Sequence, residues 1–227
     1  GMLDRFTRLV ITNAVYFKGE WVRQFNVKDT KEAFFNSPSI RTIYIPMMSR
    51  TDEESLFNYG ENNLLQILEM PYSGGDISML VILPKNGDME SIEKNLNAEK
   101  FSEWKSMMQN QRVNVFIPRF RFEKKSSVGE ILSWMGMPTA FTPQADFSLM
   151  TGNKDLFISN VIHNAFVEVN EEGTEAAAAT AVTMKLTAVM PEKPVPIFRA
   201  DRPFIFIIQQ TANSNILFIG RVINPAA

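Results

Sequence analysis

Two uninterrupted apolar runs constrain the fold of this 227-residue chain more than any other feature of its sequence. Met79–Leu83 and Phe204–Ile208 carry no polar side chain at any position. Side chains alternate between the two faces of a strand, so a strand that is apolar at every position is expected to be buried on both faces. The two runs therefore predict interior strands of a sheet that is covered on both sides.

Further strand-like runs make up much of the chain. They are rich in β-branched and aromatic residues and span 8–17, 40–48, 64–70, 113–123 and 216–219. A Pro-Tyr-Ser-Gly-Gly-Asp sequence separates 64–70 from 77–83, and an Asn-Ser-Asn sequence lies between Phe204–Ile208 and 216–219. Turn residues between two apolar runs are typical of hairpins, so we expect a hairpin at each of these places.

Three stretches show the apolar spacing of helices, namely Met89–Leu96, 98–109 and 127–135. The third begins with a capping box, in which Glu130 follows Ser127 by three residues, and it stops at Gly136. The apolar stripes are expected to pack against the core. No repeat or linker divides the chain, so residues 1–227 are predicted to form a single α+β domain dominated by mixed sheets.

Composition argues against several kinds of function. The chain has no Cys and one His, which excludes disulfide scaffolds, thiolate nucleophiles and zinc sites that need Cys or several His. Its formal net charge of -2 argues against a phosphate-seeking surface. No apolar run reaches the roughly 18 residues of a membrane span. We therefore expect no nucleic-acid partner, no membrane association and no metal or other cofactor.

Catalytic signatures are missing from the sequence as well. It contains no Gly-x-Gly-x-x-Gly, P-loop, His-Glu-x-x-His or Gly-x-Ser-x-Gly motif. Ser73–Asp76 lacks the Lys and the following helix of a phosphate loop, so we expect a tight turn there. His163 lies inside the strand-like run Phe157–Val169, where a buried, hydrogen-bonded structural role is expected. The chain is therefore not expected to be an enzyme.

The segment Glu171–Lys185 has an unusual composition. Its four consecutive alanines favour a short helix, whereas the β-branched Thr180, Val182 and Thr183 disfavour a long one. In an extended strand, one face would carry only small or apolar residues, namely Thr174, Ala176, Ala178, Thr180, Val182, Met184 and Leu186. With Gly173 as a permissive hinge, the segment suits two states, an exposed loop and a strand inserted into a sheet.

Five ordered motifs cover the chain from about residue 9 to residue 225. They are Asn13–Trp21, Val161–Phe166, Glu171–Thr180, Asp201–Phe204 and Phe218–Pro225. In that order they resemble the third strand of the central sheet, the strand that leads to the reactive loop, the loop hinge and two C-terminal strands of the serpins, the serine protease inhibitor family.

The resemblance implies a serpin-like multi-sheet fold, with a central sheet A and further sheets B and C. The first motif that matches is the third strand of the central sheet. The family's largely helical N-terminal part is therefore expected to be missing from this sequence. Residues 8–17 would then expose a strand edge, and we expect self-association through that edge.

By the same resemblance, residues 171–198 or so form an exposed reactive loop. The protein is then expected to inhibit serine-type endopeptidases by suicide cleavage of this loop and insertion of the loop into the central sheet. The hinge comprises Glu172, Gly173, Thr174, Glu175, Ala176, Ala177, Ala178, Ala179 and Thr180. Asn13, His163 and Trp21 are expected to gate the opening of the sheet, with Asn13 and His163 hydrogen-bonded to each other.

Counting from the hinge places the attacked bond between Thr187 and Ala188, with Lys185–Leu186 as the alternative. Small residues suit an elastase-like or subtilisin-like protease, whereas Lys185–Leu186 would suit a trypsin-like one. The resemblance favours a secreted, extracellular protein. A non-inhibitory serpin-like binding or storage protein is the alternative function.

Overall fold

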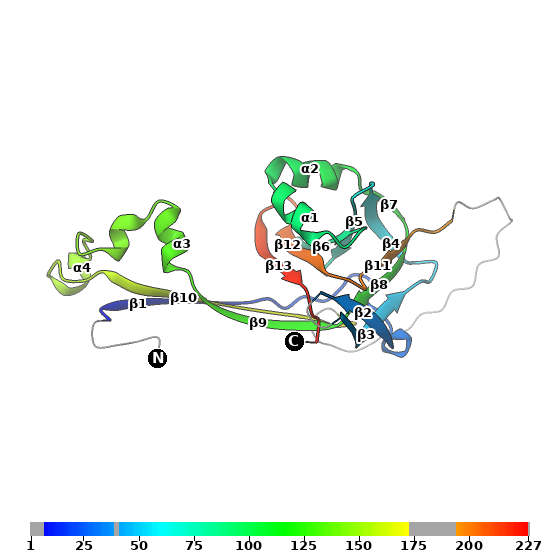
Figure 1. The fold of residues 1–227 in the computed structure, drawn as a ribbon, viewed down its shortest axis with the longest axis horizontal. Coiled ribbons are helices and arrows are strands. Elements are labelled where there is room, and N and C mark those ends of the chain that lie inside the picture. Colours follow the sequence, from blue (N-terminus) through cyan, green and yellow to red (C-terminus); the bar gives the residue numbers. More distant parts are fainter. Residues whose placement is uncertain (1–6, 39–40, 173–193, 227) are drawn as a thin grey trace. The chain divides into compact units, whose positions relative to one another are not determined.

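The computed structural model describes residues 7–38, 41–172 and 194–226 (Figure 1). They belong to two compact units. The first contains the chain up to Phe17 together with Phe122–Val167, and the second contains Lys18–Arg121 together with Glu168–Ala227. The described residues form three β-sheets and four short α-helices, which confirms the predicted α+β class.

The first unit is built on a three-stranded sheet with the strand order β1-β10-β9. Strands β1 and β10 run parallel to each other. The strands are β1 (Leu9–Tyr16), β9 (Phe120–Ser127) and β10 (Ile158–Val169). The connection from β9 to β10 carries α3 (Gly129–Trp134), the 3-10 helix η2 (Pro138–Phe141) and α4 (Ser148–Thr151).

The larger sheet of the second unit has the order β13-β12-β6-β5-β4-β7, and every neighbouring pair is antiparallel. Its strands are β4 (Leu56–Glu61), β5 (Leu65–Pro71), β6 (Ile77–Pro84), β7 (Gln109–Arg112), β12 (Phe204–Gln210) and β13 (Ile216–Val222). Both predicted hairpins, β5–β6 and β12–β13, are confirmed. Met79–Leu83 and Phe204–Ile208 are buried throughout, as expected for strands covered on both faces.

Helices α1 (Met89–Asn95) and α2 (Ala98–Ser106) cover one face of this sheet (Figure 1). Ile92 of α1 and Phe101 and Trp104 of α2 pack with apolar residues of β5, β6 and β12. Each helix starts with a side-chain cap, from Asp88 and Asn97 respectively. The predicted core packing is therefore confirmed for these two helices, although α2 ends three residues earlier than expected.

The smaller sheet of the second unit has the order β11-β8-β3-β2. Strand β11 is parallel to β8, and the other pairs are antiparallel. Its strands are β2 (Lys31–Ser37), β3 (Arg41–Arg50), β8 (Asn114–Pro118) and β11 (Ile197–Arg199), and the 3-10 helix η1 (Val27–Asp29) precedes β2.

The predicted strand 113–123 is two strands, β8 and β9, which join different sheets. Pro118 ends β8 because proline has no N–H with which to continue a ladder. The next N–H, that of Arg119, donates to the carbonyl oxygen of Pro46 at 3.0 Å. The uniform β-propensity of the run therefore concealed a change of sheet.

The expectations for the third helix are wrong in two respects. The capping box does not form, because Val128 is the N-cap residue and the Ser127 hydroxyl instead donates to Asn160 Oδ1 at 2.6 Å. The apolar stripe is not buried either, since Ile131 is 52% exposed and Met135 is 77% exposed. Helix α3 has only six residues and buries none of them within its unit.

The Ser73–Asp76 segment is a tight turn, as expected. Gly74 and Gly75 have φ values of 94° and 79°, which side chains with a Cβ rarely adopt. These two glycines let β5 reverse directly into β6.

Candidate functional site

The chain that follows β10 is fixed by backbone hydrogen bonds from an earlier segment, Trp21–Phe25. The Trp21 N–H donates to the Glu172 carbonyl oxygen at 2.9 Å, and the Phe25 N–H donates to that of Glu171 at 2.8 Å. The Trp21 indole N–H donates to the carbonyl oxygen of Asn170 at 2.9 Å. Three consecutive carbonyls, those of Asn170, Glu171 and Glu172, are thus held where the expected hinge begins.

Glu171 adds a buried charge to this arrangement, with its side chain only 4% exposed. Arg119 Nε donates to both carboxylate oxygens, at 2.7 and 2.8 Å, and the Thr30 hydroxyl donates to one of them. Burial acts to raise the pKa of Glu171, but the hydrogen bonds from Arg119 and Thr30 outweigh it and hold the pKa below its ordinary value. Glu171 is therefore ionised at neutral pH.

Trp21 supplies the apolar side of the arrangement. It is 2% exposed and stacks on Tyr72 with ring centroids 4.2 Å apart and planes 19° apart. Burial raises the pKa of the Tyr72 phenol well above its ordinary value, so the stacked ring is neutral. We call the whole group the loop anchor, and it consists of Trp21, Phe25, Thr30, Tyr72, Arg119 and Asn170–Glu172.

The far end of the expected reactive loop is also fixed in the second unit. The Asn114 N–H donates to the Pro196 carbonyl oxygen at 2.8 Å, and Gln66 Nε2 donates to that of Ile197 at 2.9 Å. Phe198 is fully buried and meets Tyr59 edge to face, with ring centroids 6.4 Å apart. The chain therefore re-enters a defined strand, β11, at the place where the resemblance ends the loop.

Asn13 and His163 lie opposite each other on the parallel strands β1 and β10 of the first unit. Asn13 Oδ1 is 2.8 Å from His163 Nδ1, within hydrogen-bonding distance. The expected hydrogen bond is present, but the expected burial of His163 is wrong, because its side chain is partly exposed. The gating role of this pair stays a prediction.

Trp21, the third residue of the expected gating group, lies in the second unit within the loop anchor, and its gating role stays a prediction as well. Of the expected hinge, only Glu172 is described. The rest of the hinge, Gly173–Thr180, and both candidate bonds, Lys185–Leu186 and Thr187–Ala188, lie outside the described residues.

Arg119 and Thr30 were not singled out from the sequence, and Glu171 was expected to begin the exposed loop, whereas it is buried. Two adjacent glutamates precede Gly173, and nothing local shows which of them is buried. Arg119 lies 52 positions away from its partner. The only local indication of the ion pair is that Arg119 directly follows Pro118, and this indication is weak.

Among the described residues, no group of acidic or histidine side chains is arranged to hold a metal ion. No helix in the same part of the chain is long and apolar enough to cross a membrane.

Comparisons with known proteins agree with this architecture. A family model described as Serpin (serine protease inhibitor) matches residues 1–225, and the chain belongs to the serpin family. An uncharacterized serpin-like protein of Thermococcus kodakarensis is 46% identical over 98% of this chain and 51% of its own length. The leukocyte elastase inhibitor A of Rattus norvegicus is 41% identical over 99% of this chain and 60% of its own length.

Solved structures give the same result for the fold. Human thyroxine-binding globulin complexed with thyroxine superposes with a TM-score of 0.85 and 30% identity, over 99% of this chain and 58% of that one. Uncleaved ovalbumin superposes with a TM-score of 0.83 and 31% identity, over 56% of its length. The serpin-like multi-sheet fold is therefore confirmed, and the chain spans little more than half the length of the proteins that it matches.

Proposed function

We propose that this chain carries the loop-bearing part of an inhibitor of serine-type endopeptidases, which acts by cleavage of a reactive loop and insertion of that loop into the β1-β10-β9 sheet. The loop anchor carries the proposal, because it fixes the point at which the expected loop leaves β10. The similarity to leukocyte elastase inhibitors supports a protease as the target.

The direction of the strands favours insertion between β1 and β10. These strands are parallel and pair along Leu9–Tyr16. A segment that follows β10 and folds back beside it runs antiparallel to β10, and therefore also antiparallel to β1. Insertion would replace one parallel ladder with two antiparallel ladders, which are slightly more stable per residue.

The side chains of the segment suit this movement. Thr174 and the alternate residues after it are small or apolar, so they can face a covered side of the sheet. Opening the sheet would break the hydrogen bond between Asn13 and His163, which is the gating role proposed for that pair. Thr187–Ala188 is the proposed bond, with Lys185–Leu186 as the alternative, and the protein is proposed to act outside the cell.

The test is incubation of the longest natural form that contains this sequence with elastase-like, subtilisin-like and trypsin-like proteases. A covalent complex that survives SDS gel electrophoresis is the expected result, together with a C-terminal peptide whose mass locates the cut. Cleavage without any stable complex, for every protease, would contradict the proposal.

Two threonines of the loop provide a matched pair of variants. Thr180→Arg places a long cation on the face to be buried, whereas Thr183→Arg places it on the other face of the inserted strand. We expect Thr180→Arg to convert the inhibitor into a substrate and Thr183→Arg to leave complex formation within about twofold, since surface substitutions change stability little. Equal effects of the two variants would contradict insertion in this register.

A non-inhibitory binding protein is the second candidate, and a cavity favours it. The cavity has a volume of about 410 Å³ and lies in the second unit, with Arg23, Glu69 and Lys105 among its lining residues. A structural neighbour carries thyroxine. Binding of thyroxine by calorimetry, lost in Lys105→Ala, together with simple cleavage by every protease, would favour this candidate over inhibition.

Self-association is proposed for the chain as it stands. Strand β1 is at the end of its sheet, and its Ile11 and Tyr16 are 40% and 64% exposed. Sedimentation should show concentration-dependent oligomers that Ile11→Lys reduces. A strictly monomeric chain at high concentration would rule the proposal out.

A further inference from the structure

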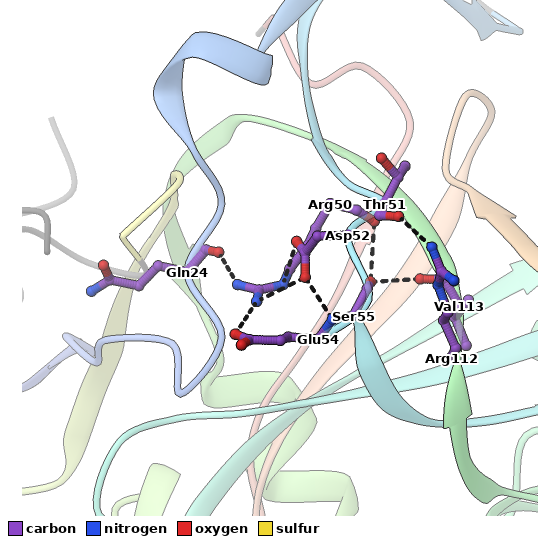
Figure 2. Close-up of polar contacts among 8 residues, drawn as sticks. All are labelled: Gln24, Arg50, Thr51, Asp52, Glu54, Ser55, Arg112 and Val113. Atoms are coloured by element: carbon purple, nitrogen blue, oxygen red, sulfur yellow. Dashed lines mark hydrogen bonds and ion pairs between the residues drawn. The ribbon is translucent and has the colours of Figure 1, made fainter. Parts of the chain in front are cut away.

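The segment Trp21–Phe25, which bonds to the carbonyls of Glu171 and Glu172, is itself bound by an arginine. Arg50, the last residue of β3, donates from Nη1 to the carbonyl oxygen of Gln24 at 2.6 Å (Figure 2). That carbonyl and the N–H of Phe25 belong to one planar peptide group. The same N–H donates to the Glu171 carbonyl oxygen at 2.8 Å.

A single peptide group therefore connects Arg50 to the loop anchor. A cation at the oxygen end of a peptide group polarises it and strengthens the hydrogen bond at its N–H end. The planarity of the group also fixes the direction of the N–H once the oxygen is held. Arg50 thus acts on the carbonyl of Glu171 without touching it.

The guanidinium of Arg50 is held in one position. Its side chain is only 16% exposed, and Nε lies 3.2 Å from Asp52 Oδ2 while Nη2 donates to Oδ1 at 3.3 Å. The Glu54 N–H donates to Asp52 Oδ1 at 2.9 Å, which orients that carboxylate (Figure 2). Arg50 is therefore positioned by the turn that follows its own strand.

Hydrogen bonds connect this turn to the residues at the start of β8. Ser55 is fully buried, and its hydroxyl lies 2.6 Å from the Val113 carbonyl oxygen and 3.1 Å from that of Arg50. Arg112 Nη2 donates to the Thr51 carbonyl oxygen at 3.2 Å (Figure 2). Such a support makes Arg50 a rigid contact rather than a mobile surface arginine.

We propose that Arg50 is a positioning residue for the loop, which sets how firmly the Gln24–Phe25 peptide holds Glu171 and thereby how cleanly the cleaved loop inserts. This inference rests on the proposed inhibitory function. A loosened anchor lets the point of departure fluctuate, so insertion is slower and more of the cleaved inhibitor is released before the protease is trapped.

The test compares Arg50→Met with Arg112→Met in the longest natural form of the protein. Methionine keeps much of the apolar stem of an arginine and removes the charge. For Arg50→Met we expect exchange of the Phe25 amide hydrogen to be about tenfold faster, because a hydrogen bond to a charged group is lost from the network. We also expect a several-fold rise in the number of inhibitor molecules consumed per protease trapped.

Arg112→Met removes an arginine that supports the turn through Thr51 but does not touch Gln24, so it should change both quantities clearly less than Arg50→Met does. Arg50→Lys keeps a cation within reach of the Gln24 oxygen, so its consumption per protease trapped should be close to that of the wild type. If Arg50→Met folds poorly, the comparison of Arg50→Lys with the wild type still tests the inference. Faster exchange with unchanged consumption would overturn the inference and leave the proposed function intact. Failure of the wild-type protein to trap any protease would instead overturn both.

Discussion

The loop anchor and the Asn13–His163 pair show two different ways of holding strands in place. The anchor combines a carboxylate that is 4% exposed, an arginine and three hydrogen bonds to consecutive carbonyls. The pair on β1 and β10 has one side-chain hydrogen bond between partly exposed groups. Hydrogen bonds to charged groups contribute about 1.5–3 kcal/mol, and neutral ones about 0.5–1.5 kcal/mol.

The difference fits the work proposed for each region. The anchor fixes the end of β10 from which the loop departs, and this point must keep its place before and after cleavage. The β1–β10 ladder must part, so a hydrogen bond of modest strength suits it better than a buried ion pair. Breaking each region separately is therefore the most direct test of the comparison.

The largest effect is expected from Glu171→Lys, which would place a second cation beside Arg119. Removing one partner of a buried ion pair costs about 3–5 kcal/mol, and the 42% exposure of Arg119 favours the lower end of that range. The matched control is Glu32→Lys, at an exposed glutamate of β2 outside the loop anchor, for which we expect a change below about 0.5 kcal/mol. Denaturant unfolding measures both, and similar losses would show that the ion pair is unimportant.

Acid should weaken the same region through Glu171. Its pKa is lower in the folded chain than its ordinary value of 4.5, so folding favours the ionised carboxylate. This stabilisation is complete above the unfolded pKa and is lost as the pH falls through the lower, folded pKa. Glu171→Gln should therefore lose less stability than the wild type below about pH 4.5 in urea unfolding, whereas parallel pH curves would contradict the assignment.

Trp21 tests the apolar part of the anchor. Trp21→Phe keeps an aromatic ring against Tyr72 but loses the hydrogen bond to the Asn170 carbonyl, so we expect a loss of about 1–3 kcal/mol. Trp134→Phe makes the same exchange at a residue that is 84% exposed and should change stability by less than about 0.5 kcal/mol. Thermal unfolding of the two variants distinguishes them, and equal melting temperatures would argue against an anchoring role.

Much of the fold could be predicted because the evidence lies within single segments. The run Met79–Leu83 is apolar at every position, and that pattern alone predicts burial on both faces. The hairpins were equally local, since turn residues lie directly between apolar runs. The resemblance to serpins rested on motifs of this kind as well.

The errors arose where the outcome depends on distant partners. Helices α2 and α3 both have apolar stripes, yet Trp104 packs on a six-stranded sheet while Ile131 of α3 is 52% exposed. Periodicity shows that a helix has an apolar face, but it does not show what lies opposite that face. The loop anchor was missed for the same reason, because it joins residues from four separate parts of the chain.

The smallest effect is expected at the Asn13–His163 pair, and a double-mutant cycle can isolate it. Asn13→Ala and His163→Ala each remove the hydrogen bond, so together they should cost less than the sum of the single changes, with a coupling of about 0.5–1.5 kcal/mol. Because β1 and β10 must separate before a strand can enter between them, each variant should also speed loop insertion, measured as the rate at which added loop peptide is bound. Additive stability changes with an unaltered rate would show that the two side chains do not stabilise each other. The proposed difference between the loop anchor and the β1–β10 ladder would then not apply to this pair.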